Sequence, residues 1–541
     1  MKHTALLIIS LLLSHCVMAQ QTFRRRQCGT AMLMEREAAA YSKGQRAIST
    51  QNNYVPHTGT ITIPVVLVNF KDVKFKINEP KKAFEQLFNS DTQADLGNGN
   101  YLNYGSVAKY FRDMSRDMSR DMSHSAFTPK FKVYGPVTVD QPETHYGGTR
   151  EDDNNDEEPR LLVEDALKLV EDQVTEDDIK SFCSDGKTID CVYIVYAGLG
   201  QNYGGDGTTV WANCSTTGGK TLGGKEVRWY TMSNELSPVK IKDKDGTTIP
   251  VVNGLGVICH EFSHSLGLPD MYPTDTLAYL DNQEMEYWDL MDGGEYTHAG
   301  FCPTAYTAFE KEQMGWPVDI KTLDSDKNVT MTTSTEQGGT AYKIVNPEND
   351  KEYLMLEYIQ RKGWNKHLFG NGLLVYHVCL PSETLDLGTH LNNDEHGYPG
   401  MAVVPADGAC LSSYIKANKN DYGNSLKGDL FPGTGNLQGQ NVTELSDTNK
   451  QPNFCWYNAT KTEKLNTNKA IKNIKYIKYD NDNSVLKFDY VNDVASGILP
   501  VWGDKQATDG RVYSINGAYL GDDITKLPHG IYIVNGQKIV K

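Results

Sequence analysis

Two histidines and a glutamate stand together as His260, Glu261 and His264 in the stretch VICHEFSHSLGLPD. On a helix, residues four positions apart share one face, so the two imidazoles can bind one metal ion. The carboxylate of Glu261 can reach a metal-activated water without occupying the metal, as a general base must. This spacing indicates a zinc centre able to hydrolyse a peptide bond.

A catalytic zinc keeps three protein ligands and one open position, so a third ligand must be found beyond the histidines. Gly267 stands three residues after His264 and permits a left-handed turn that ends the helix. The reversed chain can then carry Asp270 back to the metal. We therefore predict Asp270 as the third ligand.

The HExxH pattern also occurs by chance, but its surroundings here favour a metal site. The apolar run at residues 255–259 suits a buried helix, and the segment YWDLMDGG at residues 287–294 forms a methionine-containing turn. Met291 in this turn can form an apolar floor beneath the ligands; the alternative is an ordinary core methionine, and the two roles overlap.

Three features carry a family resemblance: the motifs HEFSHSLGLPDMY and WDLMDGG, and the pair Gly315 and Trp316. With these features, the sequence resembles the immune inhibitor A family of secreted metzincin peptidases. The likeness runs from about residue 61 to residue 433. It includes strand-like segments at residues 63–72 and 191–198, Val210 and Trp211, and the later segments 372–378, 406–408 and 428–433.

The resemblance implies a zinc endopeptidase that acts on proteins or peptides, with His260, His264 and Asp270 on the metal and Glu261 as base. Cys379 departs from the family, which usually has an acidic residue after YHV, so no metal role is assigned there. The alternative function is a catalytically silent surface adhesin on a peptidase fold. The intact HExxH favours the enzyme, because a binding protein needs no base beside the metal.

Two further residues are candidates for roles at the site. Tyr296, close to the methionine turn, can donate a hydrogen bond to the oxyanion, although ordinary packing is the better explanation in a chain with 30 tyrosines. The segment RQCGT around Cys28 resembles the cysteine switch of some pappalysin precursors, whose third ligand would be histidine where this chain has Asp270. Cys28 can fill the open zinc position of a zymogen, or it is an incidental cysteine in the leader.

Residues 1–19 read as a secretory signal, with Lys2 before a short apolar stretch and small residues at the cleavage site. No apolar run is long enough to span a membrane. Cleavage would remove Cys16, one of ten cysteines, and leave nine (10 − 1), an odd number. Cys183 and Cys191 bracket a loop and could form a local disulfide.

The chain has 541 residues, enough for several domains, and a formal net charge of −16. This charge argues against nucleic acid and anionic membranes as partners. The acidic run at residues 151–158 can hold Ca²⁺, but such a run is more often a solvated loop. RDMS occurs three times at residues 112–123, and on an extended helix Met114, Met118 and Met122 would form a skewed apolar stripe.

We predict an α+β fold: a metzincin-like zinc peptidase domain followed by β-rich, sandwich-like domains. The expected divisions are a signal peptide (1–19), a pro-segment (20–60), a catalytic domain (61–320), a β-rich accessory domain (321–491) and a C-terminal sorting domain (492–541). Residues 512–541 alternate short apolar strands with NG turns and resemble the sorting domain of type IX secretion cargo in Bacteroidota. This resemblance implies that the protein interacts with secretion machinery and is secreted or located on the outer cell surface. The sequence does not indicate an oligomeric state.

Overall fold

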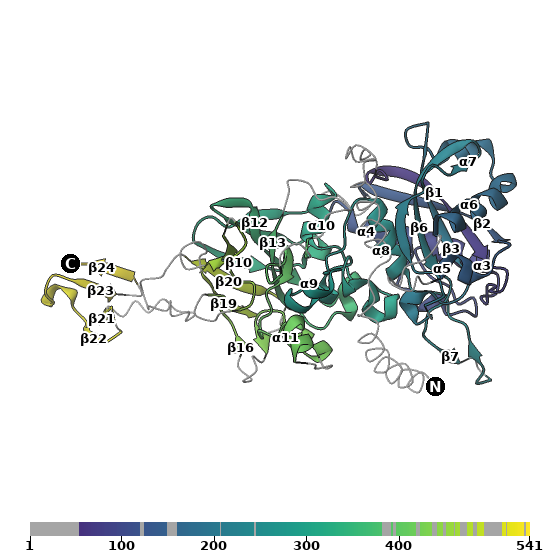
Figure 1. The fold of residues 1–541 in the computed structure, drawn as a ribbon. Coiled ribbons are helices and arrows are strands. Elements are labelled where there is room, and N and C mark those ends of the chain that lie inside the picture. The colour runs from purple at the N-terminus through teal and green to yellow at the C-terminus, as the bar shows by residue number, and fades with distance from the viewer. Residues whose placement is uncertain are drawn as a thin grey trace.

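The computed structural model describes residues 54–541, except 119–123, 149–158, 206, 243–244, 381–390, 393–395, 418–421, 435–440, 447–450, 459, 466–472, 480–483, 492–510, 516 and 535–536. The predicted signal peptide, most of the pro-segment with Cys28, and the acidic run at 151–158 lie outside the described residues. Helices and several sheets alternate along the chain (Figure 1), which confirms the mixed fold with β-rich regions after the first half.

The first half of the chain is built on a six-stranded sheet with the order β2-β1-β3-β6-β4, in which β5 also pairs with β6. Four strands are parallel: β1 (Gly59–Asn69), β2 (Phe127–Thr138), β3 (Ile189–Tyr196) and β6 (Lys225–Asn234). The short strands β4 (Asn213–Thr216) and β5 (Thr221–Leu222) run antiparallel to β6. Every residue of β3 is buried, as expected for a parallel strand covered on both faces.

Helices cover both faces of this sheet, so β1 contributes to two hydrophobic cores. Ile63 and Val65 point into one core and Val66 and Val68 into the other, following the two-residue period of a strand. The first core is closed by α3 (Pro80–Asn89), α4 (Val107–Met114) and α8 (Leu255–Ser265), and the second by α6 (Pro159–Val170) and α7 (Glu176–Ser181). The sheet thus supports α8, which carries HExxH.

The same arrangement overturns the predicted Cys183–Cys191 disulfide. Cys191 packs in the core shared with α8, whereas Cys183 packs in the core on the opposite face, and both thiols are free. All cysteines in the described part of the chain are buried except Cys455.

The RDMS repeats do not extend a helix, contrary to the prediction. Helix α4 ends at Met114, and the chain folds back so that Arg116 bridges to Ser125 and the Asp117 N–H donates to the His124 carbonyl over 2.9 Å. Met114 is in the core, whereas Met118 is 37% exposed. Identical repeats therefore occupy different environments, and Met122 lies outside the described residues.

The β-rich region contains a five-stranded and a three-stranded sheet. The five-stranded sheet has the order β14-β13-β12-β11-β9, and the three-stranded sheet has the order β10-β20-β19. The strands are β9 (Ile320–Thr322), β10 (Lys327–Met331), β11 (Ala341–Asn346), β12 (Asn349–Ile359), β13 (Gly372–Cys379), β14 (Met401–Val403), β19 (Asn473–Tyr479) and β20 (Leu486–Val491).

This five-stranded sheet joins the two regions. Leu354 and Leu356 of β12 pack with Phe488 of β20 in a third core, while Met355 and Leu374 belong to the core that contains α8. One face of the sheet therefore packs in the third core, and the other packs on the region built around the six-stranded sheet.

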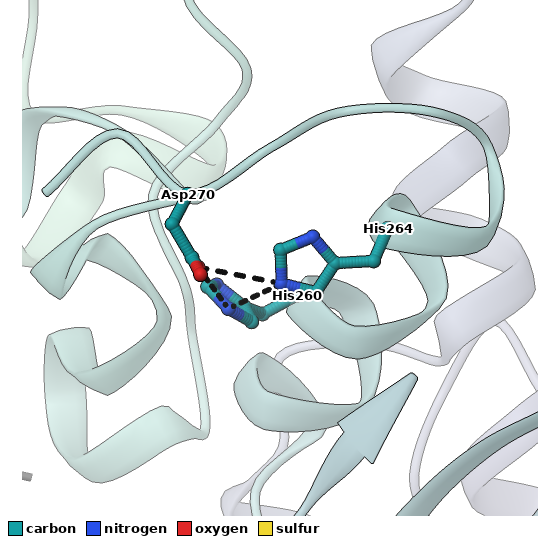
Figure 2. Close-up of side chains that lie close together, drawn as sticks. All are labelled: His260, His264 and Asp270. Carbon is teal, nitrogen blue, oxygen red and sulfur yellow. Dashed lines mark hydrogen bonds and ion pairs between the residues drawn. The ribbon is translucent and has the colours of Figure 1, made fainter. Parts of the chain in front are cut away.

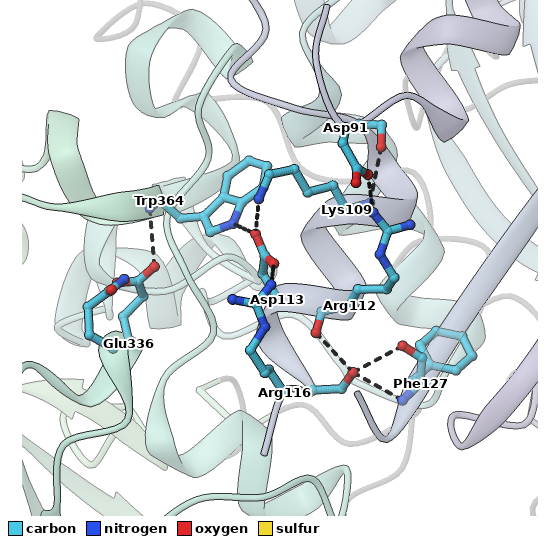
Figure 3. Close-up of polar contacts among 11 residues, drawn as sticks. Asp91, Lys109, Arg112, Asp113, Arg116, Phe127, Glu336 and Trp364 are labelled. Atoms are coloured by element: carbon cyan, nitrogen blue, oxygen red, sulfur yellow. Dashed lines mark hydrogen bonds and ion pairs between the residues drawn. The ribbon is translucent and has the colours of Figure 1, made fainter. Parts of the chain in front are cut away.

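Polar contacts reinforce this junction (Figure 3). Asp113 at the end of α4 accepts hydrogen bonds from Lys109 and Arg116, and from the indole N–H of the buried Trp364 at 3.0 Å. The backbone N–H of Trp364 donates to Glu336 over 3.3 Å. The first RDMS repeat thus ties α4 to the β-rich region.

The chain ends in a small antiparallel sheet, β22-β21-β23-β24, at the far end from the six-stranded sheet in Figure 1. Its strands are β21 (Val512–Ser514), β22 (Tyr519–Gly521), β23 (Ile531–Val534) and β24 (Gln537–Val540). Among the described residues, no helix has both the length and the apolar character needed to cross a membrane.

Candidate metal centre

Helix α8 is completely buried, and its first turn packs closely on another loop. The N–H of Leu255 donates to the Asn103 side chain over 3.0 Å, which satisfies one free amide of the helix start. A Cβ at position 256 would lie 1.9 Å from the Glu295 carbonyl oxygen, so only Gly256 permits this contact. His260, Glu261 and His264 are consequently held on a helix with a fixed position.

The left-handed turn predicted at Gly267 is present, with φ of +109°. The N–H of Gly267 donates to the His264 carbonyl over 2.9 Å, and that of Leu268 to the Ser263 carbonyl over 3.2 Å, which closes the helix end. The chain reverses here, and Asp270 follows three residues later.

The reversal brings Asp270 to both histidines (Figure 2). Asp270 Oδ1 lies 3.3 Å from Nε2 of His260 and 3.3 Å from Nε2 of His264, and the two Nε2 atoms are 3.2 Å apart. In a tetrahedral zinc site with bonds of about 2.0–2.1 Å, ligand atoms stand about 3.3–3.4 Å apart. Three atoms at these separations match one face of such a tetrahedron.

Both imidazoles are oriented by backbone carbonyl groups. Nδ1 of His260 donates to the Leu290 carbonyl over 3.0 Å, and Nδ1 of His264 donates to the Leu268 carbonyl over 2.7 Å. A carbonyl only accepts, so Nδ1 of each ring carries a proton and Nε2 is the nitrogen left to bind a metal, as in metal-ligating histidines.

Leu290 belongs to the methionine turn between η4 (Glu286–Trp288) and η5 (Gly293–Gly300). In the same turn, the carbonyl of the buried Met291 accepts from the N–H of Met271, the residue after Asp270, over 2.9 Å. The turn is therefore bonded to the segments that carry His260 and Asp270.

The electrostatics of Asp270 agree with a metal ligand. Burial by itself would raise the pKa of Asp270, but His264 and His260 more than offset it and hold the pKa below its ordinary value. Oδ1 is buried and accepts no hydrogen bond. A buried carboxylate oxygen without a donor is costly unless another positive partner binds it, so the donor set fits a zinc ion.

Two acidic side chains stand beside the ligands. Glu261, predicted as base, is 2% exposed on α8. Glu295, which the sequence did not single out, is also buried, and its Oε2 is 4.0 Å from Nδ1 of His260. Burial raises the pKa of Glu295 to about 7; His260 opposes the rise, and Glu261 adds to it. No spacing rule marks Glu295, because only the packing of η5 on α8 brings it here.

Tyr296 is half-buried and follows Glu295 directly. Its ring packs edge-on against Tyr203, with centroids 5.8 Å apart, and a hydrogen bond from Tyr296 lowers the pKa of Glu295. The structure thus brings His260, His264 and Asp270 together, with Glu295 beside His260 and Tyr296 bonded to Glu295. Within the described part of the chain, His260, His264 and Asp270 are the only group of three acidic, histidine or cysteine residues close enough to hold a metal ion.

Comparison with known proteins shows similarity to a family of peptidases. Residues 50–317 match the family model of the immune inhibitor A peptidase M6 catalytic domain. The chain is 26% identical over 353 residues to immune inhibitor A of Bacillus thuringiensis subsp. alesti, covering 56% of this chain and 49% of that protein. It is 25% identical over 253 residues to the pre-pro-metalloprotease PrtV of Vibrio cholerae serotype O1 (strain M66-2), covering 42% of this chain and 25% of that protein.

The chain therefore spans about half or less of the length of these relatives. The matched region contains the six-stranded sheet, α8, Asp270 and the methionine turn. Over residues 50–317, the chain is thus similar to the catalytic domain of the immune inhibitor A (M6) peptidase family.

Proposed function

We propose that this protein is a secreted zinc-dependent endopeptidase of the metzincin type that hydrolyses protein substrates. The observation that carries the proposal is the triangle of Nε2, Nε2 and Oδ1 atoms, with edges of 3.2 to 3.3 Å. His260, His264 and Asp270 would hold the zinc, and Met291 would lie beneath them.

A zinc ion held there would act as a Lewis acid that activates water and polarises the scissile carbonyl. Glu261 takes the proton of the attacking water and delivers it to the departing amine, so the carboxylate is regenerated when the C–N bond has broken. Its near-complete burial, at 2% exposure, keeps this carboxylate away from bulk water. Leu290 and Leu268 hold the imidazoles still through their carbonyl groups.

We propose Tyr296 as the donor to the developing oxyanion. Tyr296 donates a hydrogen bond to Glu295. During the reaction, the Tyr296 hydroxyl must therefore leave Glu295 and donate to the substrate oxygen instead. An ordinary packing role would leave the rate constant unchanged in a Tyr296→Phe variant.

The remaining sequence predictions complete the proposal. Residues 1–19 would direct export, and Cys28 would occupy the open zinc position before the pro-segment is removed. The C-terminal module would engage type IX secretion machinery. Exposed apolar side chains on that module support a docking role: Ile515, Tyr519, Leu520, Ile531, Ile539 and Val540. We propose domain divisions at about residues 60, 320 and 491, and calcium remains a proposal for the acidic run at 151–158.

The function is tested with purified, processed protein on casein or gelatin, with zinc measured on the same sample. We expect cleavage that a chelator abolishes and added zinc restores. Glu261→Ala should lower kcat by about 10²–10⁴-fold while retaining zinc. Unchanged activity in this variant would exclude Glu261 as base. A wild-type protein that holds zinc, cuts no peptide in a library and binds a host protein would instead be the silent adhesin.

A further inference from the structure

The residues just before β1 pack on the end of the metal-binding helix. We call residues 54–57 the N-terminal strap. The N–H of the fully buried Val55 donates to the Ser265 carbonyl, at the last residue of α8, over 2.9 Å. The indole N–H of Trp316 donates to the His57 carbonyl over 2.7 Å. The strap is thus anchored at both ends although it precedes the first strand.

Within the strap, the ring of Tyr54 covers the turn after α8. A Cβ at Gly267 would lie 3.0 Å from Cδ2 and 3.2 Å from Cε2 of this ring, so the ring lies directly over the turn. Tyr54 also stacks on Trp229 of β6, with centroids 5.3 Å apart and planes inclined by 24°. Because Trp229 belongs to the sheet, Tyr54 connects the sheet to the turn.

The covered turn controls two parts of the metal site. Asp270 follows Gly267 by three residues, and the Leu268 carbonyl between them orients His264. Glycine with positive φ has more conformational freedom than other residues, so the turn needs outside contacts to keep one geometry. The ring of Tyr54 supplies such a contact.

We propose that Tyr54 is a positioning residue for the zinc site, which fixes Asp270 and the Leu268 carbonyl by packing on Gly267. The inference rests on the proposed zinc function. The proposal also revises the processing point: a cut at residue 60, the predicted end of the pro-segment, would remove the strap, so we place the activating cleavage N-terminal to Tyr54.

The test compares three substitutions in the processed protein: Tyr54→Ala, Tyr54→Phe and Tyr104→Ala. Tyr104 is the matched control, since it is also half-buried and its ring packs on a tryptophan, Trp364, at 4.9 Å. Zinc affinity is measured by competition with a chromogenic chelator, and ligand geometry from the visible spectrum of the Co²⁺-substituted protein.

We expect Tyr54→Ala to weaken zinc binding by about tenfold, as for other residues that orient ligands, and to alter the Co²⁺ bands. Tyr54→Phe keeps the ring and should match wild type, and Tyr104→Ala should also match it. Equal zinc affinity in Tyr54→Ala and wild type overturns the inference, as does an equal loss in Tyr104→Ala. A wild-type protein that binds no zinc refutes the proposed function itself, which is a distinct outcome.

Sequencing the N-terminus of the active protein tests the limit on processing. We expect the first residue to be Tyr54 or an earlier one. An active, zinc-loaded protein that begins after Tyr54 would overturn the positioning role.

Discussion

At the scale of single residues, the metal site depends on local hydrogen bonds as much as on its ligands. His264 is oriented by a carbonyl four residues away, and His260 by one thirty residues away. Asp270 has Oδ1 directed at both imidazoles, with no hydrogen-bond donor of its own. The three side chains are therefore preorganised, which lowers the entropic cost of binding a metal.

Removal of the proposed third ligand, Asp270, tests this arrangement. Asp270→Ala leaves two imidazoles, and we expect zinc content after dialysis to fall well below one ion per chain. Asp275→Ala is the control, because Asp275 caps α9 (Thr276–Asp281) from the same loop at a half-exposed position. It should retain full zinc. Metal analysis after dialysis against a weak chelator gives the measurement, and full zinc in Asp270→Ala would exclude Asp270 as a ligand.

A second residue-scale prediction concerns Asp289 in the methionine turn. Burial raises its pKa from 3.8 to about 7, helped by Asp292, and burial likewise raises the pKa of its neighbour Glu310. A carboxyl whose pKa is higher in the folded state contributes stability below about pH 4 that is lost as pH rises towards 7. Asp289 Oδ1 accepts from the Met291 N–H at 2.8 Å, and an asparagine oxygen can do the same.

Asp289→Asn should therefore gain stability relative to wild type as pH rises. From about pH 5 to about pH 8 we expect the difference in free energy of unfolding to shift by at least about 1 kcal/mol in favour of the variant. Urea unfolding of the metal-free proteins measures it. Asp324→Asn, at an exposed position, should show no such trend. A pH-independent difference for Asp289→Asn would show that the buried carboxyl is not the cause.

At the scale of elements, the identical RDMS repeats adopt different structures because different parts of the molecule pack against them. Met114 and Met118 occupy the same place in successive RDMS repeats, yet Met114 is 1% exposed and its sulfur accepts from the Tyr306 N–H. Met118 is 37% exposed, beside Gly338. The helix ends between them because the chain must turn to form the bridge at Arg116.

This pair offers a matched comparison. Met114→Ala should destabilise the protein by about 2–5 kcal/mol, because it removes a buried side chain and leaves a cavity. Met118 is partly exposed, so Met118→Ala should change stability by no more than about 0.5 kcal/mol. Denaturant unfolding followed by tryptophan fluorescence measures both. Equal losses would mean that the second repeat is as well packed as the first.

At the scale of the whole molecule, the peptidase part and the β-rich region share one hydrophobic core, whereas the C-terminal sheet stands apart. Met355 and Leu374 of the β-rich region belong to the core that contains α8. No hydrophobic cluster of the described residues contains a position after Tyr490. We infer that the β-rich region supports the catalytic fold and that the terminal module is separable from it.

Deletion of residues 511–541 should accordingly leave zinc content, thermal unfolding and peptidase activity unchanged. In a bacterium with type IX secretion machinery, we expect the truncated chain to accumulate inside the outer membrane while the full chain is exported. Cell fractionation with an antibody to the catalytic region measures this. Residues 492–541 fused to a neutral periplasmic protein should be sufficient for export, and normal export of the truncated chain would refute the sorting role.

The sequence by itself determined the local geometry of the proposed metal site. His260 and His264 share a face because a helix repeats every 3.6 residues, and the reversal towards Asp270 follows from the positive φ that Gly267 allows. The predicted disulfide and helix extension failed, because the face on which Cys191 lies and the point at which α4 ends depend on packing by distant segments.

Only the tertiary structure decided what surrounds the ligands. Glu295 and the carbonyl of Leu290 reach His260 from about thirty residues away, and Tyr54 reaches Gly267 from more than two hundred. Backbone hydrogen bonding fixes contacts within a turn of helix, so spacing alone reveals them. Contacts between distant segments depend on how the whole core packs. The spacing of residues along the chain therefore does not reveal them.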